Sequence, residues 1–167
     1  MTISMYDAAT KPLLAFLDNL AGLVQKAADH VDAKKLDPDA LLKARLFPDM
    51  FPFIRQVQIA CDFAKNTVSR LAGIEPPKHD DTETSFADLL TRIKTAKAVV
   101  AGMTPDQING SETRSIVLQM RHGDMTFAGV DYLGGFALPN FYFHVTTAYN
   151  ILRHNGVEIG KGNFFGR

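Results

Sequence analysis

This chain of 167 residues contains no tryptophan and a single cysteine, Cys61. One cysteine cannot form an internal disulfide, and a chain without disulfides is typical of a reducing compartment, so we expect a cytoplasmic protein. The length is sufficient for one domain with a sizeable core. Because no linker, repeat or low-complexity segment divides the sequence, we predict a single domain over residues 1–167.

The sequence also lacks an excess of either charge, since 18 basic residues balance 18 acidic ones. Without a basic stripe or a motif of the common DNA and RNA readers, we expect no nucleic-acid partner. No apolar run reaches the roughly 18 residues that a membrane-spanning helix needs, so we expect no membrane association. The N-terminus has no basic segment followed by an apolar run, and we expect no signal peptide.

Several common catalytic motifs are missing as well. The sequence has no glycine-rich phosphate loop between a strand and a helix, no nucleophilic serine elbow and no cysteine pairs of a zinc site. Cys61 shares the apolar face of a predicted helix with Val57 and Val68, where a thiol is inert. These motifs therefore favour no enzyme class and point to no particular cofactor.

What the sequence does have is helical periodicity. Apolar residues recur every three or four positions in four stretches. These stretches are residues 3–31, 52–72, 84–103 and 138–156. Ser4 and Asp7 resemble a capping box at the start of the first stretch, and Gly73 ends the second. Pro12 is expected to kink the first helix or to mark its regular start. Four amphipathic helices predict an all-α, up-and-down four-helix bundle.

The long connection between the third and fourth helices does not show this helical periodicity. Residues 116–117 are β-branched, and together with the segment 125–127 they flank a turn at residues 122–124. This pattern predicts a short β-hairpin within the crossover. The glycine pair at 134–135 is expected to interrupt any helix there, so that the fourth helix begins at Pro139.

The C-terminal tail carries two adjacent aromatic residues, Phe164 and Phe165, among glycines. Exposing two neighbouring rings to water is unfavourable. We therefore expect the tail to dock either onto the body of the protein or onto a partner.

The helix over residues 138–156 places one imidazole beside its apolar stripe. His144 lies on one flank of the stripe and Tyr149 on the other. A buried imidazole without a hydrogen-bond partner is costly. We therefore expect His144 to be largely removed from water and hydrogen-bonded to another helix, with Gln56 as the first candidate partner.

Two stretches of the sequence, residues 49–58 and 138–160, resemble a bacterial family of unknown function within the DinB/YfiT-like superfamily of four-helix bundles. The resemblance covers nearly the whole chain and implies an up-and-down bundle with a crossover, often as a homodimer. In many members of that superfamily, one histidine of the second helix and two of the fourth, spaced i, i+4, bind a divalent metal. Some of those members transfer or isomerise substrates with low-molecular-weight thiols.

This chain does not match those three histidines. Asn140 stands four residues before His144, an alanine stands four residues after it, and the helix over residues 52–72 has no histidine. The polar candidates of that helix are Gln56 and Asp62. Transition metals take three or four ligands of N, S or O type, so these residues make at most a weak, oxygen-rich site. We expect the metal site of the superfamily to be degenerate here, with His144 as its remaining ligand.

Three functional hypotheses remain open at this point. The leading hypothesis is a small-molecule-binding bundle with a pocket between the second and fourth helices, lined by Gln56, His144 and Tyr149. The alternative is a metal- or thiol-dependent transferase or isomerase with a different ligand set. The third is a non-catalytic structural dimer. Arg55, beside Gln56, is a candidate for binding an anion or is a solvated group.

Overall fold

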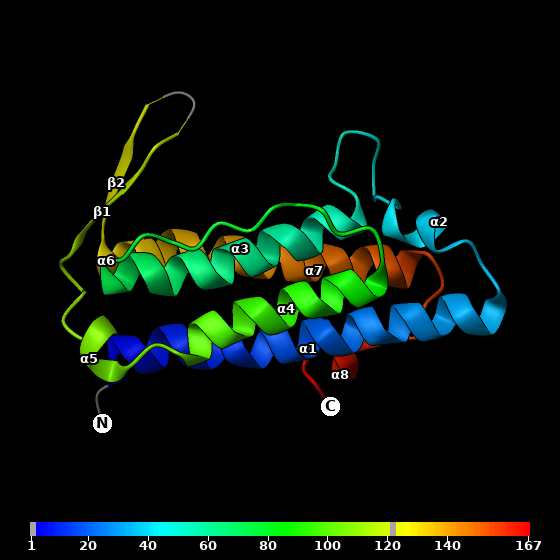
Figure 1. Ribbon diagram of the computed structural model, residues 1–167, viewed down its shortest axis with the longest axis horizontal. Coiled ribbons are helices and arrows are strands. Elements are labelled where there is room, and N and C mark those ends of the chain that lie inside the picture. Colours follow the sequence, from blue (N-terminus) through cyan, green and yellow to red (C-terminus); the bar gives the residue numbers. More distant parts are fainter. Residues whose placement is uncertain (1–2, 121–122) are drawn as a thin grey trace.

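The computed structural model describes residues 3–120 and 123–167 and shows four long helices packed side by side (Figure 1). The four are α1 (Met5–Lys34), α3 (Phe53–Ala72), α4 (Phe86–Ala101) and α7 (Leu138–His154). α3 packs against both α7 and α4, and α1 packs mainly against α4. The predicted all-α bundle is therefore confirmed. No helix in the described parts of the chain has both the length and the apolar character needed to cross a membrane.

Local capping signals explain where these helices begin and end. The backbone N–H of Asp7 donates to Ser4 Oγ at 3.1 Å at the start of α1. The same contact, from the backbone N–H of Asp88 to Ser85 Oγ at 3.1 Å, starts α4. α3 ends at Gly73, whose φ of 72° lies in the left-handed region that glycine adopts without strain. The predicted caps thus set three of the helix ends.

The structure decides against one of the two alternatives for Pro12. α1 runs from Met5 through Pro12, so the helix does not start at Pro12, and it ends at Lys34 because Lys35 takes a left-handed conformation with φ of 52°. The glycine pair at 134–135, which was expected to interrupt a helix, lies within a continuous helical segment. The π-helix η1 (Tyr132–Ala137) joins α6 (Gly129–Asp131) directly to α7. The i→i+5 hydrogen bonding of a π-helix makes a wider turn, which carries the helical path through these glycines.

The predicted β-hairpin is present and projects from one end of the bundle (Figure 1). Strands β1 (Ser115–Leu118) and β2 (Met125–Ala128) pair antiparallel, with Ile116 opposite Phe127. His122, in the predicted turn, lies outside the described residues. Three short helices complete the fold. α2 (Pro38–Leu42) and α5 (Pro105–Ile108) lie in connections between the long helices, and α8 (Lys161–Phe164) lies in the C-terminal tail.

The C-terminal tail docks onto the body of the protein. The ring of Phe164 lies 5.2 Å from that of Phe16 in α1 and 5.7 Å from that of Tyr149 in α7, measured between centroids. Val157 and Ile159, which lead into the tail, are buried. Of the two alternatives expected from the sequence, docking onto the body of the protein or onto a partner, the structure shows the first.

Residues 73–85, which we call the crossing segment, run along the length of the bundle between α3 and α4 (Figure 1). As a result, α3 and α4 point in the same direction. Their first residues, Phe53 and Phe86, lie side by side with ring centroids 6.3 Å apart. The crossing segment and the hairpin both lie beside α3, and this arrangement positions the polar features described next.

Candidate functional site

His144 lies at the seam between α3 and α7, where its Nδ1 is 2.7 Å from Gln56 Oε1. The predicted hydrogen bond between these two residues is confirmed. Gln56 is 1% exposed, and its Nε2 donates to the carbonyl oxygen of Phe51 at 3.0 Å. Because a carbonyl can only accept, this contact fixes the amide and leaves Oε1 as the atom facing His144. Nδ1 of His144 therefore carries the proton, and its Nε2 keeps a lone pair.

The imidazole of His144 is half-buried between aromatic rings. Phe63 stacks on it with centroids 5.8 Å apart, and Phe143 meets it edge-on at 5.3 Å. Desolvation, helped by the positive charge of Arg55, lowers the pKa of His144 to about 4. At neutral pH the ring is uncharged, so its chemistry is that of a hydrogen-bond acceptor or a metal ligand at Nε2.

The donor set around His144 does not fit the metal of the superfamily. Asn140, one turn earlier, donates its Nδ2 to the carbonyl oxygen of Phe136 at 2.7 Å, and Asp62 is committed to an ion pair with Arg92 at 2.8 Å. Across residues 3–120 and 123–167, no three His, Cys, Asp or Glu side chains gather to hold an ion. One imidazole nitrogen alone is too few ligands for a transition metal.

The other predicted site residues are dispersed. Tyr149 lies under the C-terminal tail against Phe164. Arg55 forms an ion pair with Asp81 in the crossing segment and donates to Gln58 Oε1 at 3.2 Å. The structure thus brings His144, Gln56 and the charge of Arg55 together, and places Tyr149 elsewhere.

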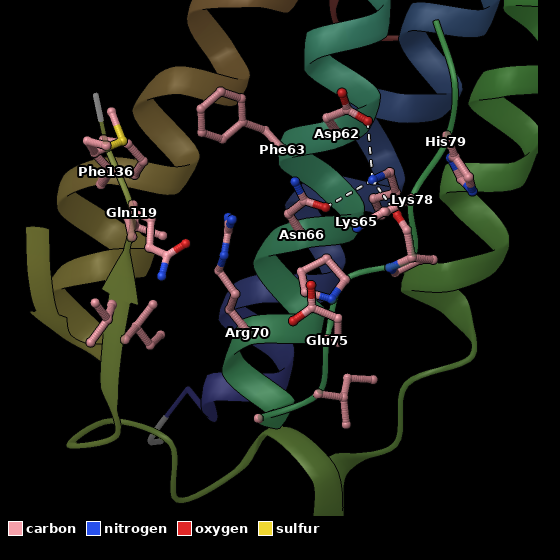
Figure 2. Close-up of a pocket in the computed structure, with 18 of the residues that line it drawn as sticks. Asp62, Phe63, Lys65, Asn66, Arg70, Glu75, Lys78, His79, Gln119 and Phe136 are labelled. Atoms are coloured by element: carbon pink, nitrogen blue, oxygen red, sulfur yellow. Dashed lines mark hydrogen bonds and ion pairs between the residues drawn. The ribbon is translucent and has the colours of Figure 1, made fainter. Parts of the chain in front are cut away.

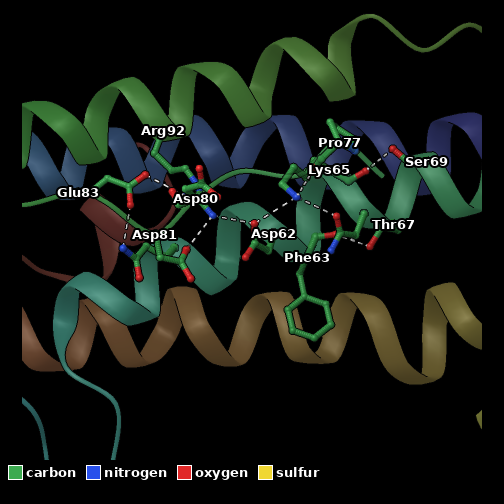
Figure 3. A network of polar contacts seen from close by, with 12 residues as sticks. Asp62, Phe63, Lys65, Thr67, Ser69, Pro77, Asp80, Asp81, Glu83 and Arg92 are labelled. Atoms are coloured by element: carbon green, nitrogen blue, oxygen red, sulfur yellow. Dashed lines mark hydrogen bonds and ion pairs between the residues drawn. The ribbon is translucent and has the colours of Figure 1, made fainter. Parts of the chain in front are cut away.

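A network of ion pairs joins α3, the crossing segment and α4 (Figure 3). Arg92 is its centre, with a side chain that is 3% exposed. Its guanidinium lies 2.8 Å from Asp62, 3.2 Å from Asp81 and 3.0 Å from Glu83, and it also donates to the carbonyl oxygen of Asp80 at 3.0 Å. A buried cation with this many acceptors is a structural group that ties the three segments together.

Lys65 extends the network toward the C-terminal half of α3, with a side chain that is 4% exposed. Its Nζ donates to the carbonyl oxygen of Pro77 at 2.7 Å and to Asn66 Oδ1 at 3.0 Å, and lies 3.2 Å from Asp62. An ammonium has three N–H groups, so all of them have acceptors. Next to Lys65, burial raises the pKa of the Cys61 thiol, which agrees with the inert role predicted for it.

A cleft of about 1080 Å³ lies next to this network, between α3, the crossing segment and β1 (Figure 2). Phe63 and Phe136 supply aromatic surface, and Asn66, Arg70 and Gln119 supply polar groups. Phe63 lines the cleft and also stacks on His144, so it connects the cleft to the α3–α7 seam. Of the site residues predicted from the sequence, Asp62 is the one that lines this cleft.

Arg70 is the half-buried cation of the cleft. Its Nη1 donates to the hydroxyl oxygen of Tyr132 at 3.1 Å, and its guanidinium carbon lies 6.0 Å from the centroid of that ring. Figure 2 shows Arg70 extending into the space between α3 and β1, with Gln119, which directly follows β1, facing it. Within the described ranges, neither Arg70 nor Arg114, a second cation lining the cleft, forms an ion pair.

Comparison with known proteins agrees with this architecture. Residues 5–165 match the family model described as "Domain of unknown function (DUF1993)". The chain belongs to the DUF1993 family. It is also similar to a solved structure, a DinB family member protein from Shewanella denitrificans, with 41% sequence identity and a TM-score of 0.88. That similarity covers 97% of this chain and 92% of the other. The search of curated proteins gave no match.

The expected resemblance to a DinB-like family of unknown function is therefore confirmed, but the sequence did not point to the most polar parts of this DUF1993 protein. Arg92 could have been noticed, because it lies three residues after Leu89 and four before Ala96, on the buried face of its helix. A charge at such a position indicates a buried ion pair. Arg70 and Arg114 carry no comparable signal, since the cleft forms from segments far apart in the chain.

Proposed function

We propose that this DUF1993 protein is a cytoplasmic small-molecule-binding bundle whose ligand occupies the cleft between α3, the crossing segment and β1. The observation that carries the proposal is the composition of the cleft wall. The aromatic rings of Phe63 and Phe136 line the same cleft as the half-buried side chain of Arg70. Ligand sites combine apolar surface with a few fixed polar groups in this way, in cavities of roughly 300–1,000 Å³.

In this proposal the His144–Gln56 pair holds the ring of Phe63, which forms part of the cleft wall, in position. The pair joins α7 to α3 through the 2.7 Å hydrogen bond, and the imidazole stacks on the ring of Phe63. His144 and Gln56 are then positioning residues for one wall of the cleft. The superfamily metal site is degenerate, since Asn140 and Asp62 are held by other contacts.

A fragment screen by ligand-observed NMR tests the location of the site. Gln119→Trp places a large side chain in the cleft opposite Arg70, and Gln25→Trp is the matched control, because Gln25 is exposed on α1 and does not line the cleft. We expect fragments that bind the wild type to bind Gln25→Trp and to be excluded by Gln119→Trp. Fragments that bind all three proteins equally would contradict the proposal.

Elemental analysis tests the proposed loss of the metal site. We expect protein purified without added metal to carry well under one equivalent of zinc, nickel, manganese or iron. Stoichiometric metal that is lost on His144→Ala would instead favour the metal-dependent transferase.

We also propose that the protein forms a homodimer, on the basis of its resemblance to the superfamily. The tail does not support this proposal, because Phe164 already packs against Phe16 and Tyr149 of the same chain. Light scattering is the test, and a monomer at about 50 µM, by reference to ordinary interface affinities, would contradict it.

A further inference from the structure

We infer that the ligand of this cleft carries an anionic group, a carboxylate or a phosphate, which Arg70 binds while the apolar part of the ligand packs against Phe63 and Phe136. The inference rests on the proposed function, and it specifies the chemical class of the ligand. It follows from how the hydrogen-bond donors of the cleft are satisfied.

Arg70 differs from the buried cations of the protein. Arg92 and Lys65, which are 3% and 4% exposed, each have carboxylate partners. Arg70 is half-buried, and in the described residues its side chain donates to the neutral phenol of Tyr132. A guanidinium has five N–H groups, and withdrawing it from water without a counter-ion is costly. An anionic ligand would supply the missing counter-charge.

The side chain of Arg70 is also held in place for such a ligand. Tyr132 is fully buried, and its hydroxyl oxygen accepts from one Nη of Arg70 at 3.1 Å. The remaining N–H groups of the planar fork are left for the cleft. A fixed guanidinium matches the geometry of a carboxylate or phosphate and can bind it through two parallel hydrogen bonds.

Asn66 presents a hydrogen-bond donor, its Nδ2 amide group, to the same cleft. Its Oδ1 must accept from Lys65, at 3.0 Å, because an ammonium can only donate. This contact fixes the amide, and Figure 2 shows Nδ2 on the side of Asn66 that faces away from Lys65. Lys65 itself has acceptors for all three N–H groups, so it takes no part in binding.

Arg114 adds a second positive charge at the edge of the cleft. Its guanidinium lies against Gly73, where an added Cβ would come within 2.1 Å of Nη1. Glycine at this position, with φ of 72°, therefore both ends α3 and leaves room for Arg114. Two cations near one end of the cleft strengthen the attraction for an anion.

Three carboxylates also line the cleft, and none of them neutralises Arg70. Asp62 is bound to Arg92 and Lys65. Glu75 and Asp80 are exposed on the crossing segment, and neither is ion-paired to Arg70 or Arg114 in the described parts of the chain. Selection of a cationic ligand by these two acids is the outcome that competes with our inference.

The experiment compares four probes that share one aromatic ring and differ in charge. They are phenylacetate, phenyl phosphate, the neutral phenylacetamide and the cationic 2-phenylethylamine, titrated by NMR at low salt. We expect one or both anions to bind at least about tenfold more tightly than the amide and the amine. A preference between the two anions identifies the ligand group as carboxylate or phosphate.

Variants tie the preference to the cleft. Arg70→Gln should weaken binding of the anions by about tenfold or more, and Arg70→Lys should retain part of it. Arg114→Gln should have a smaller effect. The matched control is Arg153→Gln, since Arg153 is exposed near the end of α7 and does not line the cleft. Circular dichroism of each variant checks that the fold is kept, and if Arg70→Gln does not fold, Arg70→Lys carries the comparison.

The outcomes separate this inference from the proposed function. If all four probes bind with equal affinity and Gln119→Trp excludes them, the cleft is a binding site but the anionic preference is wrong. Preferential binding of the amine would overturn the inference in the same way. If no probe binds at about 5 mM while fragments of the screen bind and are excluded by Gln119→Trp, the inference fails and the proposed function stands.

Discussion

On the side of α3 that faces α4, Arg92 and Lys65 are almost completely withdrawn from water, and carboxylates or carbonyl oxygens surround both of them. On the side that faces β1, Arg70 is half-buried and bonded to a phenol. The cations beside α3 are thus in two different environments, with Arg92 of α4 and Lys65 of α3 in one and Arg70 of α3 in the other. The difference separates groups that hold the fold together from groups that are available to a ligand.

This difference has a thermodynamic meaning. Removing one partner from a closed network leaves the others charged and unpaired, so stability falls. Removing a polar group that has no ion-pair partner inside the protein changes the free energy of unfolding little, because functional sites hold such groups at some expense of stability. Equivalent substitutions in the two places should therefore change the free energy of unfolding by different amounts.

The largest expected effect is that of Arg92→Gln. This change leaves Asp62, Asp81 and Glu83 without their shared cation, and we expect the free energy of unfolding to fall by about 2–4 kcal/mol. We place the value below that of a fully buried pair because Asp62 and Asp81 are 29% and 39% exposed. Chemical denaturation measures the change.

The control for this prediction is Lys97→Gln. Lys97 pairs with Asp18 at the surface, where the two side chains are 41% and 58% exposed. Its loss should cost no more than about 0.5 kcal/mol. If the two variants were equally stable, the Arg92 network would not be holding the segments together.

The next effect in size is that of His144→Ala. The substitution removes the hydrogen bond to Gln56 and leaves the Gln56 amide oxygen unpaired in a site that is 1% exposed. We expect a loss of about 1–3 kcal/mol in the melting or denaturation curve. His154→Ala, at an exposed position of the same helix, should be close to neutral. Unchanged or improved stability of His144→Ala would instead identify the pair as part of a binding site.

A smaller effect should appear as a dependence of stability on pH. Burial and Arg55 lower the pKa of His144 from its usual 6.5 to about 4 in the folded protein. Between these values the unfolded chain binds the proton and the folded protein does not, so stability falls as the pH drops from 6.5 toward 4. We expect a contribution of about 1–2 kcal/mol after allowance for the solvated part of the ring.

His144→Gln isolates this contribution, because its stability should fall less than that of the wild type over the same pH interval. The comparison is needed since burial, together with the charges of Lys65 and Arg92, also lowers the pKa of His79. Protonation of His79 therefore also lowers stability as the pH falls, and His79 is present in both the wild type and His144→Gln. Parallel pH profiles for the two proteins would contradict the prediction.

The smallest effect on stability is expected for Arg70→Gln. Arg70 has no ion pair to lose within the described residues, so the free energy of unfolding should change by less than about 1 kcal/mol. Denaturation of Arg70→Gln beside Arg92→Gln gives the direct comparison of the two sides of α3. A loss as large as that of Arg92→Gln would show that Arg70 is also a structural group.

The sequence predicted those parts of the protein that depend on local chemistry. Ser4, Ser85 and Gly73 mark helix ends because capping involves neighbours within a few residues. The contact between His144 and Gln56 was predicted because each lies at a defined position on a helix and a buried imidazole needs a partner.

The cleft could not be predicted in the same way. Its walls come from α3, the crossing segment and the hairpin, and the path of the crossing segment has no signature in the local sequence. What distinguishes Arg70 from Arg92 is the set of neighbouring carboxylates, which are themselves distant in sequence. The π-helix at Tyr132–Ala137 was missed because glycine pairs usually indicate an interruption.

That π-helix also has an evolutionary consequence. With i→i+5 hydrogen bonds, it accommodates one residue more than an α-helix would over the same turns. Loss of one codon from the pair 134–135 would turn this segment into an α-helix that sweeps the same turns, so Tyr132 would keep its direction relative to α7. The hydroxyl that holds Arg70 would stay in place, and the four-helix core would keep its packing. A length change of a single residue at this position is therefore absorbed by the π-helix without loss of the anchoring of Arg70.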